Sequence, residues 1–333
     1  MSEKSESIAV DLFIESHVGL VSKSNIERWI NGLTSFHNRH SKSIYNHQVA
    51  NWLKKELEIS GYKDKEKDKD KKDGVYFHKF RENGFELKNV ICNKRDETNK
   101  IILICGHYDT ILGDNAEDTV SRAPGANDNA SGVAAILEIA RILFSVDLKY
   151  SIRFVLFSGE EQGLIGSGHY VNAITRKKED LSLIINLDMI GVPDYRANKK
   201  KIKKENKGSQ CDFPLIRKTI QIDVDKEFKN QPSCNEIKEN DEESDKYGTI
   251  MEQMAKNYTD VQGKKGSVYS SDYCPFEARG YVVIGAYDRT AEEDNPHYHS
   301  CSDIPTNLDM DFLISVTKMV IATILQVARK GPS

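Results

Sequence analysis

The chain has 333 residues, of which 29% are charged and 38% are hydrophobic, and its formal net charge is -4 at pH 7. This balance is typical of a globular protein, and it excludes a strongly basic nucleic-acid-binding domain and an extended disordered tail. The length allows one large α/β domain or two smaller ones.

The amino-terminal residues 1–7 are polar and acidic, and no stretch approaches the eighteen or so apolar residues that a membrane span needs. We therefore expect no membrane or nucleic-acid partner. We also expect a cytoplasmic location, or a secreted or periplasmic one if a leader has been removed.

The six cysteines lie far apart and form no Cys-x-x-Cys pair, which argues against a structural zinc ribbon or a redox motif. Their even number allows disulfides without implying them. Cys105 lies in an apolar run, where a buried reduced thiol is expected.

Residues 8–60 carry apolar side chains at helical spacing, which predicts a helical segment, 1–60 with its polar start, that packs on the rest of the chain. We expect its histidines, His37, His40 and His47, to be surface residues or hydrogen-bonded core residues rather than ligands.

The mixed-sign run that follows predicts a solvated charged loop at 61–73. Residues 75–80 and 87–92 then predict two strands that form a hairpin through the turn Asn83-Gly84.

Three later apolar runs each deliver polar residues at or near their end. Run 101–105 precedes His107 and Asp109, run 151–157 precedes Glu160 and Glu161, and run 181–191 contains Asp188. Buried strands of a parallel sheet carry such residues to the edge where ligands bind in open α/β sheets.

Each of these polar positions also has a simpler interpretation. His107 and Asp109 point to the same side of an extended chain, which suits a metal-binding imidazole oriented by a carboxylate, or merely a capped strand end. Glu160 and Glu161 are either a metal ligand beside a proton carrier or a solvated surface pair. An isolated acid such as Asp188 inside an apolar run must be paired or bound to metal.

The turn 123–132 precedes residues 133–143, which predict a helix that is apolar on nearly every face and therefore buried. Asp128 in this turn thus enters the interior, either as a helix-capping acid or as a ligand whose second oxygen serves another metal.

Residues 194–260 contain a Lys-rich tract, a possible strand at 219–224 and an acidic tract at 236–245. We expect an elaborated insert there, with some order, a possible lid role and no metal site. A helix is expected at 251–258 and another from 308 to about 329. Strands that alternate with helices predict an α/β fold, here a single three-layer α/β/α domain, 1–333, with a central mixed, mostly parallel sheet.

Taken together, these motifs resemble the M28 family of zinc aminopeptidases across most of residues 75–330. The resemblance rests on five segments in the family's order: Gly106-His107-Tyr108-Asp109, Asn127-Asp128-Asn129-Ala130-Ser131-Gly132, Gly159-Glu160-Glu161-Gln162-Gly163-Leu164-Ile165-Gly166-Ser167, Leu187-Asp188-Met189-Ile190-Gly191 and Tyr298-His299-Ser300-Cys301-Ser302-Asp303.

The resemblance implies two Zn²⁺ ions. His107 and Asp188 would complete one site, Glu161 and His299 the other, and Asp128 would bridge them. His297 competes with His299, which is preferred because the family's pattern places the ligand directly before a short polar stretch that ends in Asp, here Asp303.

The resemblance also assigns Asp109 as the carboxylate that orients His107, and Glu160 as the general base for a water shared by the two ions. It implies a cis peptide bond between Asp128 and Asn129. The oxyanion-stabilising residue stays open among Tyr269, Tyr273 and Tyr298, with Tyr287 a more distant fourth.

The resulting hypothesis is a metallo-aminopeptidase whose substrates are the amino termini of peptides or small proteins. One alternative is a glutaminyl cyclase with a single zinc on the same fold. Another is a non-catalytic peptide-binding domain, which the complete set of acids and histidines argues against. An M20-type hydrolase would carry a separate dimerisation domain, for which the sequence shows no segment.

Overall fold

The computed structural model describes residues 10–66, 73–193, 218–228, 234, 237–288 and 295–330. Its strands are β1 (Gly74–Glu82), β2 (Phe85–Lys94), β3 (Ile101–His107), β4 (Ser151–Phe157), β5 (Leu181–Asp188), β6 (Thr219–Val224), β7 (Gln262–Ser267) and β8 (Val283–Tyr287). Its helices are α1 (Leu12–Val18), α2 (Lys23–Ser35), α3 (Asn46–Ile59), α4 (Gly132–Leu143), α5 (Ile165–Lys177), α7 (Asp241–Tyr258), α8 (Cys274–Glu277) and α9 (Met310–Lys330), with the short turns η1 (Ala126–Ser131) and η2 (Pro305–Asn307).

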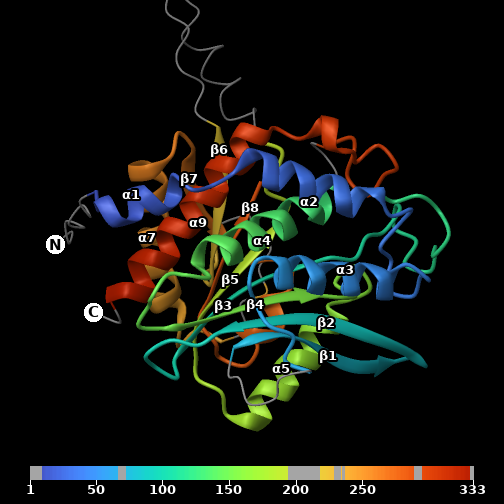
Figure 1. The fold of residues 1–333 in the computed structure, drawn as a ribbon, viewed down its shortest axis with the longest axis horizontal. Coiled ribbons are helices and arrows are strands. Elements are labelled where there is room, and N and C mark those ends of the chain that lie inside the picture. Colours follow the sequence, from blue (N-terminus) through green and yellow to red (C-terminus); the bar gives the residue numbers. More distant parts are fainter. Residues whose placement is uncertain are drawn as a thin grey trace, which may run out of the picture.

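In the described residues, eight strands form one sheet in the order β1-β2-β4-β3-β5-β8-β6-β7 (Figure 1). The central strands β4, β3, β5 and β8 are mutually parallel, whereas β2 pairs antiparallel with β4 and β6 pairs antiparallel with β8. Because the four parallel strands run the same way, their carboxyl ends meet at one edge of the sheet.

Helices cover both faces of the sheet, as predicted. Ile102 and Ile104 of β3 pack in one hydrophobic cluster with residues of α2, α3, α4 and α9, while Ile101 and Leu103 pack in a second cluster with residues of α5 and α8. This alternation follows from the two-residue period of a strand, and every residue of β3 is buried because both faces are covered. The three-layer α/β/α architecture with a mixed sheet is confirmed.

The predicted hairpin is also confirmed. β1 and β2 pair antiparallel up to Glu82 and Phe85, and the turn residues Asn83 and Gly84 have φ values of 48° and 84°. Two consecutive left-handed residues are the geometry that Asn-Gly favours in a two-residue hairpin turn.

The helical prediction for residues 8–60 is too coarse, because the structure has three helices there and residues 36–45 are not helical. Polar side chains of this connection reach buried positions: Asn38 donates to the carbonyl oxygens of Thr119 and Ser121, and Arg39 is completely buried. Tertiary hydrogen bonds therefore replace the helix that the apolar spacing predicted.

The three histidines of this segment each contact a backbone carbonyl through Nε2, as expected for hydrogen-bonded residues. His37 contacts Val120 at 2.9 Å, His40 contacts Ala116 at 2.9 Å, and His47 contacts Glu86 at 2.8 Å. They therefore tie the amino-terminal segment to neighbouring loops.

The predicted charged loop begins with ordered residues. Val75 exchanges backbone hydrogen bonds with Lys63 and Lys65, and Lys54 forms ion pairs with Asp64 at 2.8 Å and Glu66 at 3.0 Å. Residues 67–72 lie outside the described residues.

Part of the predicted insert extends the sheet, and part of it is helical. The strand expected at 219–224 is present as β6, and the acidic tract contributes the first turn of α7, which begins at Asp241 rather than near Met251. Three acidic residues in that turn face the positive end of the helix dipole, which favours helix over loop. The Lys-rich tract 199–207 lies outside the described residues, and a lid role stays a prediction.

The expectation of no membrane-length apolar stretch is corrected by α9. Its residues 310–329 are long and apolar enough by composition to cross a membrane, although they include Asp311, Lys318, Gln326 and Arg329 besides Ser and Thr residues. However, 72% of its most apolar window is buried inside the protein, where the helix packs against α1, α4 and α7. We interpret α9 as a core helix.

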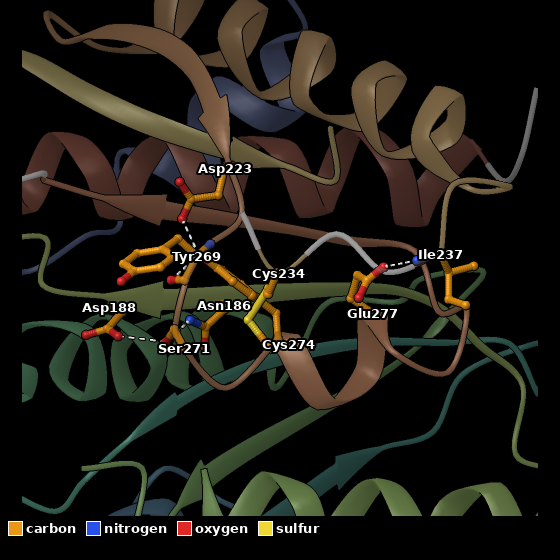
Figure 2. Close-up of a disulfide and its surroundings, with 10 residues drawn as sticks. Asn186, Asp188, Asp223, Cys234, Ile237, Tyr269, Ser271, Cys274 and Glu277 are labelled. Atoms are coloured by element: carbon orange, nitrogen blue, oxygen red, sulfur yellow. Dashed lines mark hydrogen bonds between the residues drawn. A yellow bond between two sulfur atoms is a disulfide. The ribbon is translucent and has the colours of Figure 1, made fainter. Parts of the chain in front are cut away.

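A disulfide joins Cys234 to Cys274 at the start of α8 (Figure 2). Beside it, the backbone amide of Cys234 donates to the carbonyl of Val268, and that of Ile237 donates to Glu277 at 2.6 Å. Cys92 and Cys105 are buried and free, as expected for Cys105, whereas Cys301 is exposed and Cys211 lies outside the described residues. The disulfide thus fixes the segment between β7 and β8.

Replacing both Cys234 and Cys274 with Ser should lower the free energy of unfolding by about 2–4 kcal/mol, because the crosslink closes a loop with a sequence separation of 40 residues. Urea unfolding without reductant measures the effect. Cys301→Ser is the matched control and should leave the midpoint unchanged. Equal stability of the double variant and the parent would contradict the prediction.

Candidate active site

Five of the predicted ligand residues gather at the carboxyl edge of the parallel strands. His107 and Asp188 are the last residues of β3 and β5, and Glu161 follows β4. Asp128 lies in η1, and His299 arrives on the loop before η2 with a φ of 48°. The topology therefore brings together residues that are almost 200 positions apart in the chain.

Asp128 lies at the centre of this group. Its Oδ1 is 3.2 Å from Nε2 of His107, and its Oδ2 is 3.1 Å from Nε2 of His299. His107 Nε2 also lies 3.3 Å from Asp188, and His299 Nε2 lies 3.1 Å from Glu161. The result is two sets of one histidine and two carboxylates that share Asp128.

Asp109 supports both acidic residues that follow β4. Its Oδ1 accepts a hydrogen bond from the backbone amide of Glu160 at 3.1 Å, and its Oδ2 accepts one from that of Glu161 at 3.2 Å. Its Oδ1 is also 3.7 Å from Nδ1 of His107. One buried carboxylate thereby fixes the turn after β4 and lies beside the histidine at the end of β3, whose Nδ1 has no hydrogen-bond partner among the described residues.

The turn that carries Asp128 is fixed from two sides. Asp303 accepts hydrogen bonds from the backbone amides of Asn127 at 2.9 Å and Asp128 at 3.0 Å. Asn129 donates to the carbonyl of Leu187 and accepts from the amide of Met189, next to Asp188. The Asp128-Asn129 peptide bond is cis, as the family resemblance implied.

Asp188 receives a hydrogen bond from Ser271 (Figure 2). Ser271 Oγ donates to Asp188 Oδ2 at 2.7 Å and accepts from Asn186 Nδ2 at 2.8 Å. This places Asp188 Oδ2 toward Ser271 while Oδ1 faces His107. Ser271 belongs to the segment that the disulfide anchors three residues later.

The electrostatics of the group reflect its crowded, buried carboxylates. Burial raises the pKa of Glu160, and burial with the charge of Asp128 raises the pKa of Glu161 to about 7. Burial opposes protonation of His299, but the carboxylates of Asp128 and Glu161 outweigh it and raise its pKa to about 10. The crowded carboxylates therefore favour a bound proton or another positive charge between them.

A cavity of about 340 Å³ opens over these residues. Its walls include Met189, Asp223, Tyr269, Ser270, Ser271, Tyr273, Tyr287 and Tyr298, in addition to His107, Asp128, Glu160, Glu161 and Asp188. Glu160 thus faces the same space as the ligand-type residues.

All four tyrosines considered for oxyanion stabilisation line the cavity, and three of them differ clearly in their surroundings. Tyr273 is buried, and its hydroxyl donates to Asp223 at 2.9 Å and accepts from the backbone amide of Tyr269. Tyr298 stacks on His299 with ring centroids 3.7 Å apart, and Tyr269 is 55% exposed at the cavity. The contacts of Tyr273 identify it as part of the cavity wall.

The residues present suit a divalent metal. Each set places one ligand-type atom per residue within 4.8 Å of the others, and His107, Glu160 and Glu161 form a third overlapping combination. Oε1 of Glu161 is buried and has no hydrogen-bond partner among the described residues. Imidazole nitrogens with carboxylate oxygens are a donor set that zinc accepts.

The structure separates the two competing histidines. His297 directs Nδ1 to Ser302 Oγ at 2.8 Å, whereas His299 reaches Asp128 and Glu161.

The sequence interpretation missed Arg39, Asn186 and Ser271. A signal for Arg39 was present, because residues 37–43 contain no apolar side chain in the middle of a region of helical apolar spacing.

Comparison with known proteins gives a consistent result. The model of peptidase family M28 matches residues 89–324. A probable leucine aminopeptidase of Trichophyton verrucosum (strain HKI 0517) is 25% identical over 95% of this chain and 76% of its own length.

Solved structures share the fold. The LapA aminopeptidase of Legionella pneumophila superposes with a TM-score of 0.73 at 19% identity, covering 100% of this chain and 79% of that chain. The glutaminyl cyclase of Porphyromonas gingivalis superposes with a TM-score of 0.67 at 20% identity, covering 92% of this chain and 99% of that chain. Because the family match spans more than half of the chain and includes every residue of both three-residue sets, the protein belongs to peptidase family M28.

Proposed function

We propose that the protein is an aminopeptidase that removes amino-terminal residues from peptides, with two zinc ions and Glu160 as the general base. The observation that carries the proposal is the orientation of Asp128, whose two oxygens face two different histidines, each with a further carboxylate beside it. A shared acid between two sets is the arrangement that a pair of metal ions requires.

His107, Asp128 and Asp188 would hold one ion, and Asp128, Glu161 and His299 the other. When bound, the ions would polarise the scissile carbonyl and acidify the attacking water.

Glu160 is placed to move the proton. Glu160 lines the cavity, while its backbone amide is fixed by Asp109. A carboxylate oxygen of Glu160 accepts a proton from the water as the water oxygen bonds to the carbonyl carbon. The same oxygen then gives that proton to the departing amine nitrogen as the C–N bond breaks. The raised pKa of Glu160, caused by burial, suits a group that must hold this proton.

The cavity supports action at a free amino terminus. Its volume of about 340 Å³ is at the small end of ligand pockets, and its acidic residues favour a protonated α-amine. The similarity to a protein described as a probable leucine aminopeptidase supports the same substrate class.

A glutaminyl cyclase is the second candidate, because glutaminyl cyclases share this fold. A single zinc would need only one of the two sets. The presence of His107 and Asp188 as a second set favours the aminopeptidase.

The purified protein should contain two zinc ions per chain by elemental analysis and release free amino acids from aminoacyl p-nitroanilides. Chelation should abolish the release, and added zinc should restore it. A glutaminyl peptide tests the second candidate: one zinc with conversion to a pyroglutamyl product would replace the proposal, and activity that survives complete removal of metal would contradict it.

The neighbouring glutamates provide a matched pair of variants. Glu160→Gln should lower kcat by about 10²–10⁴-fold, because the proton acceptor is lost, while the zinc content stays at the parental value. Glu161→Gln should lower zinc affinity, because a ligand oxygen is lost. Elemental analysis after dialysis and steady-state kinetics distinguish the two. Full turnover by the Glu160 variant would exclude its role as base.

A further inference from the structure

Arg39 is a buried guanidinium directly behind the candidate metal ligands. It lies in the connection between α2 and α3, and its side chain is 0% exposed. A buried arginine needs partners for its donors. The side-chain donors of Arg39 are all directed at backbone carbonyls.

Three of the four carbonyls belong to two segments that carry ligand-type residues, and the fourth is that of Leu33, 3.4 Å from Nη1. Nε donates to the carbonyl of Tyr108 at 2.7 Å, which lies between His107 and Asp109. Nη2 donates to the carbonyl of Gly125 at 2.9 Å, and Nη1 donates to that of Pro124. One planar guanidinium therefore joins the end of β3 to the turn that carries Asp128.

The turn packs closely against this contact, with no room for a side chain at Gly125. Gly125 has a φ of 53°, and a Cβ at this position would lie 2.2 Å from the backbone oxygen of Asp128 and 2.9 Å from Nη2 of Arg39. Its carbonyl also accepts from the amide of Ala130. Arg39 thus packs against the start of a tight turn whose end positions Asp128.

Thr110 reinforces the same link. Its hydroxyl accepts a hydrogen bond from the backbone amide of Arg39 at 2.9 Å and donates to the carbonyl of Ala123 at 3.1 Å. Asn46 donates to the carbonyl of Arg39 at 3.3 Å. The backbone and the side chain of Arg39 are both held.

Charge adds a second effect. Burial lowers the pKa of Arg39 to about 10, and the carboxylates of Asp303, Asp128, Asp109 and Glu161 act in the opposite direction. The residue therefore stays cationic at neutral pH and offsets part of the repulsion among the acids behind the cavity.

We propose that Arg39 is a positioning residue for the metal centre, which sets the geometry of both zinc sites by holding the His107 segment and the Asp128 turn together. This inference rests on the proposed zinc sites. Because Asp128 belongs to both sets, displacement of its turn should weaken both ions, whereas a change that touches only Asp188 should weaken one.

The test compares zinc affinity among variants, measured by competition with a chromophoric chelator. Arg39→Lys keeps the charge but cannot donate to the carbonyls of Tyr108 and Gly125 in the same fork geometry. We expect the affinity for both ions to fall by about 10–100-fold, the range for residues that orient metal ligands. Ser271→Ala is the comparison variant and should weaken one ion only, because Ser271 contacts Asp188.

Arg153→Lys is the matched control for a buried arginine. Arg153 is 3% exposed and donates to Asn93 and Tyr170, away from the ligand residues. This variant should lower thermal stability without changing zinc affinity. Parental zinc affinity in folded Arg39→Lys would overturn the inference, since a merely structural role predicts lost stability alone.

If Arg39→Lys does not fold, the zinc affinity of Thr110→Val tests the inference instead. This nearly isosteric change removes the hydroxyl that joins Arg39 to Ala123, and it should lower the affinity for both ions by a smaller factor. Unchanged zinc affinity there would overturn the inference. Parental protein that binds no zinc would instead refute the proposed function, so the two failures are distinguishable.

Discussion

The position of Asp128 is the constraint on which the rest of the site depends. The carboxylate of Asp128 faces two histidines and is buried, and a buried carboxylate is strongly unfavourable unless it is paired or bound to a cation. The structure meets this requirement by fixing the backbone around Asp128. Asp303 holds its amide, and Asn129 ties the next residue to the end of β5. Neither contact occupies the two oxygens that face the histidines.

The sheet positions the residues around Asp128 because its central strands are parallel and covered by helices on both faces. Strand ends that meet at one edge place His107, Asp188 and the turn after β4 within a few ångströms of one another without long loops. The helices on both faces bury those strands between two hydrophobic clusters. A site on such a rim has a rigid base, and only its outer wall consists of loops and later elements.

The strand-end part of the site could be predicted from the sequence, because an apolar run that ends in polar residues signals both the strand and its edge. His107 and Glu161 were found in this way. Ser271 and Arg39 were not, since their significance lies in contacts with Asp188 and Gly125, which are 83 and 86 residues away. Hydrogen bonds over such separations leave no periodic pattern. The same reason explains the interrupted amino-terminal helix: apolar spacing predicts which residues face the core, but it does not show that a polar segment between them folds inward.

The strand ends that carry the histidines and acids are separate from the elements that form the outer cavity wall. This separation helps to explain how one fold can serve different reactions. The candidate ligand residues come from β3, β5, η1, the turn after β4 and a single late loop. Asp223, Tyr269 and Tyr273 of the cavity wall come instead from β6 and the segment before α8. β6 and β7 extend the sheet beyond β8. The disulfide joins Cys234, which follows β6 in the chain, to Cys274 at the start of α8. The segment before α8 contacts the candidate ligand residues through Ser271, which donates a hydrogen bond to Asp188. Changes elsewhere in that segment can therefore reshape the cavity while the arrangement of the histidines and carboxylates around Asp128 is preserved, which fits the occurrence of aminopeptidases and glutaminyl cyclases among the structures that share this fold.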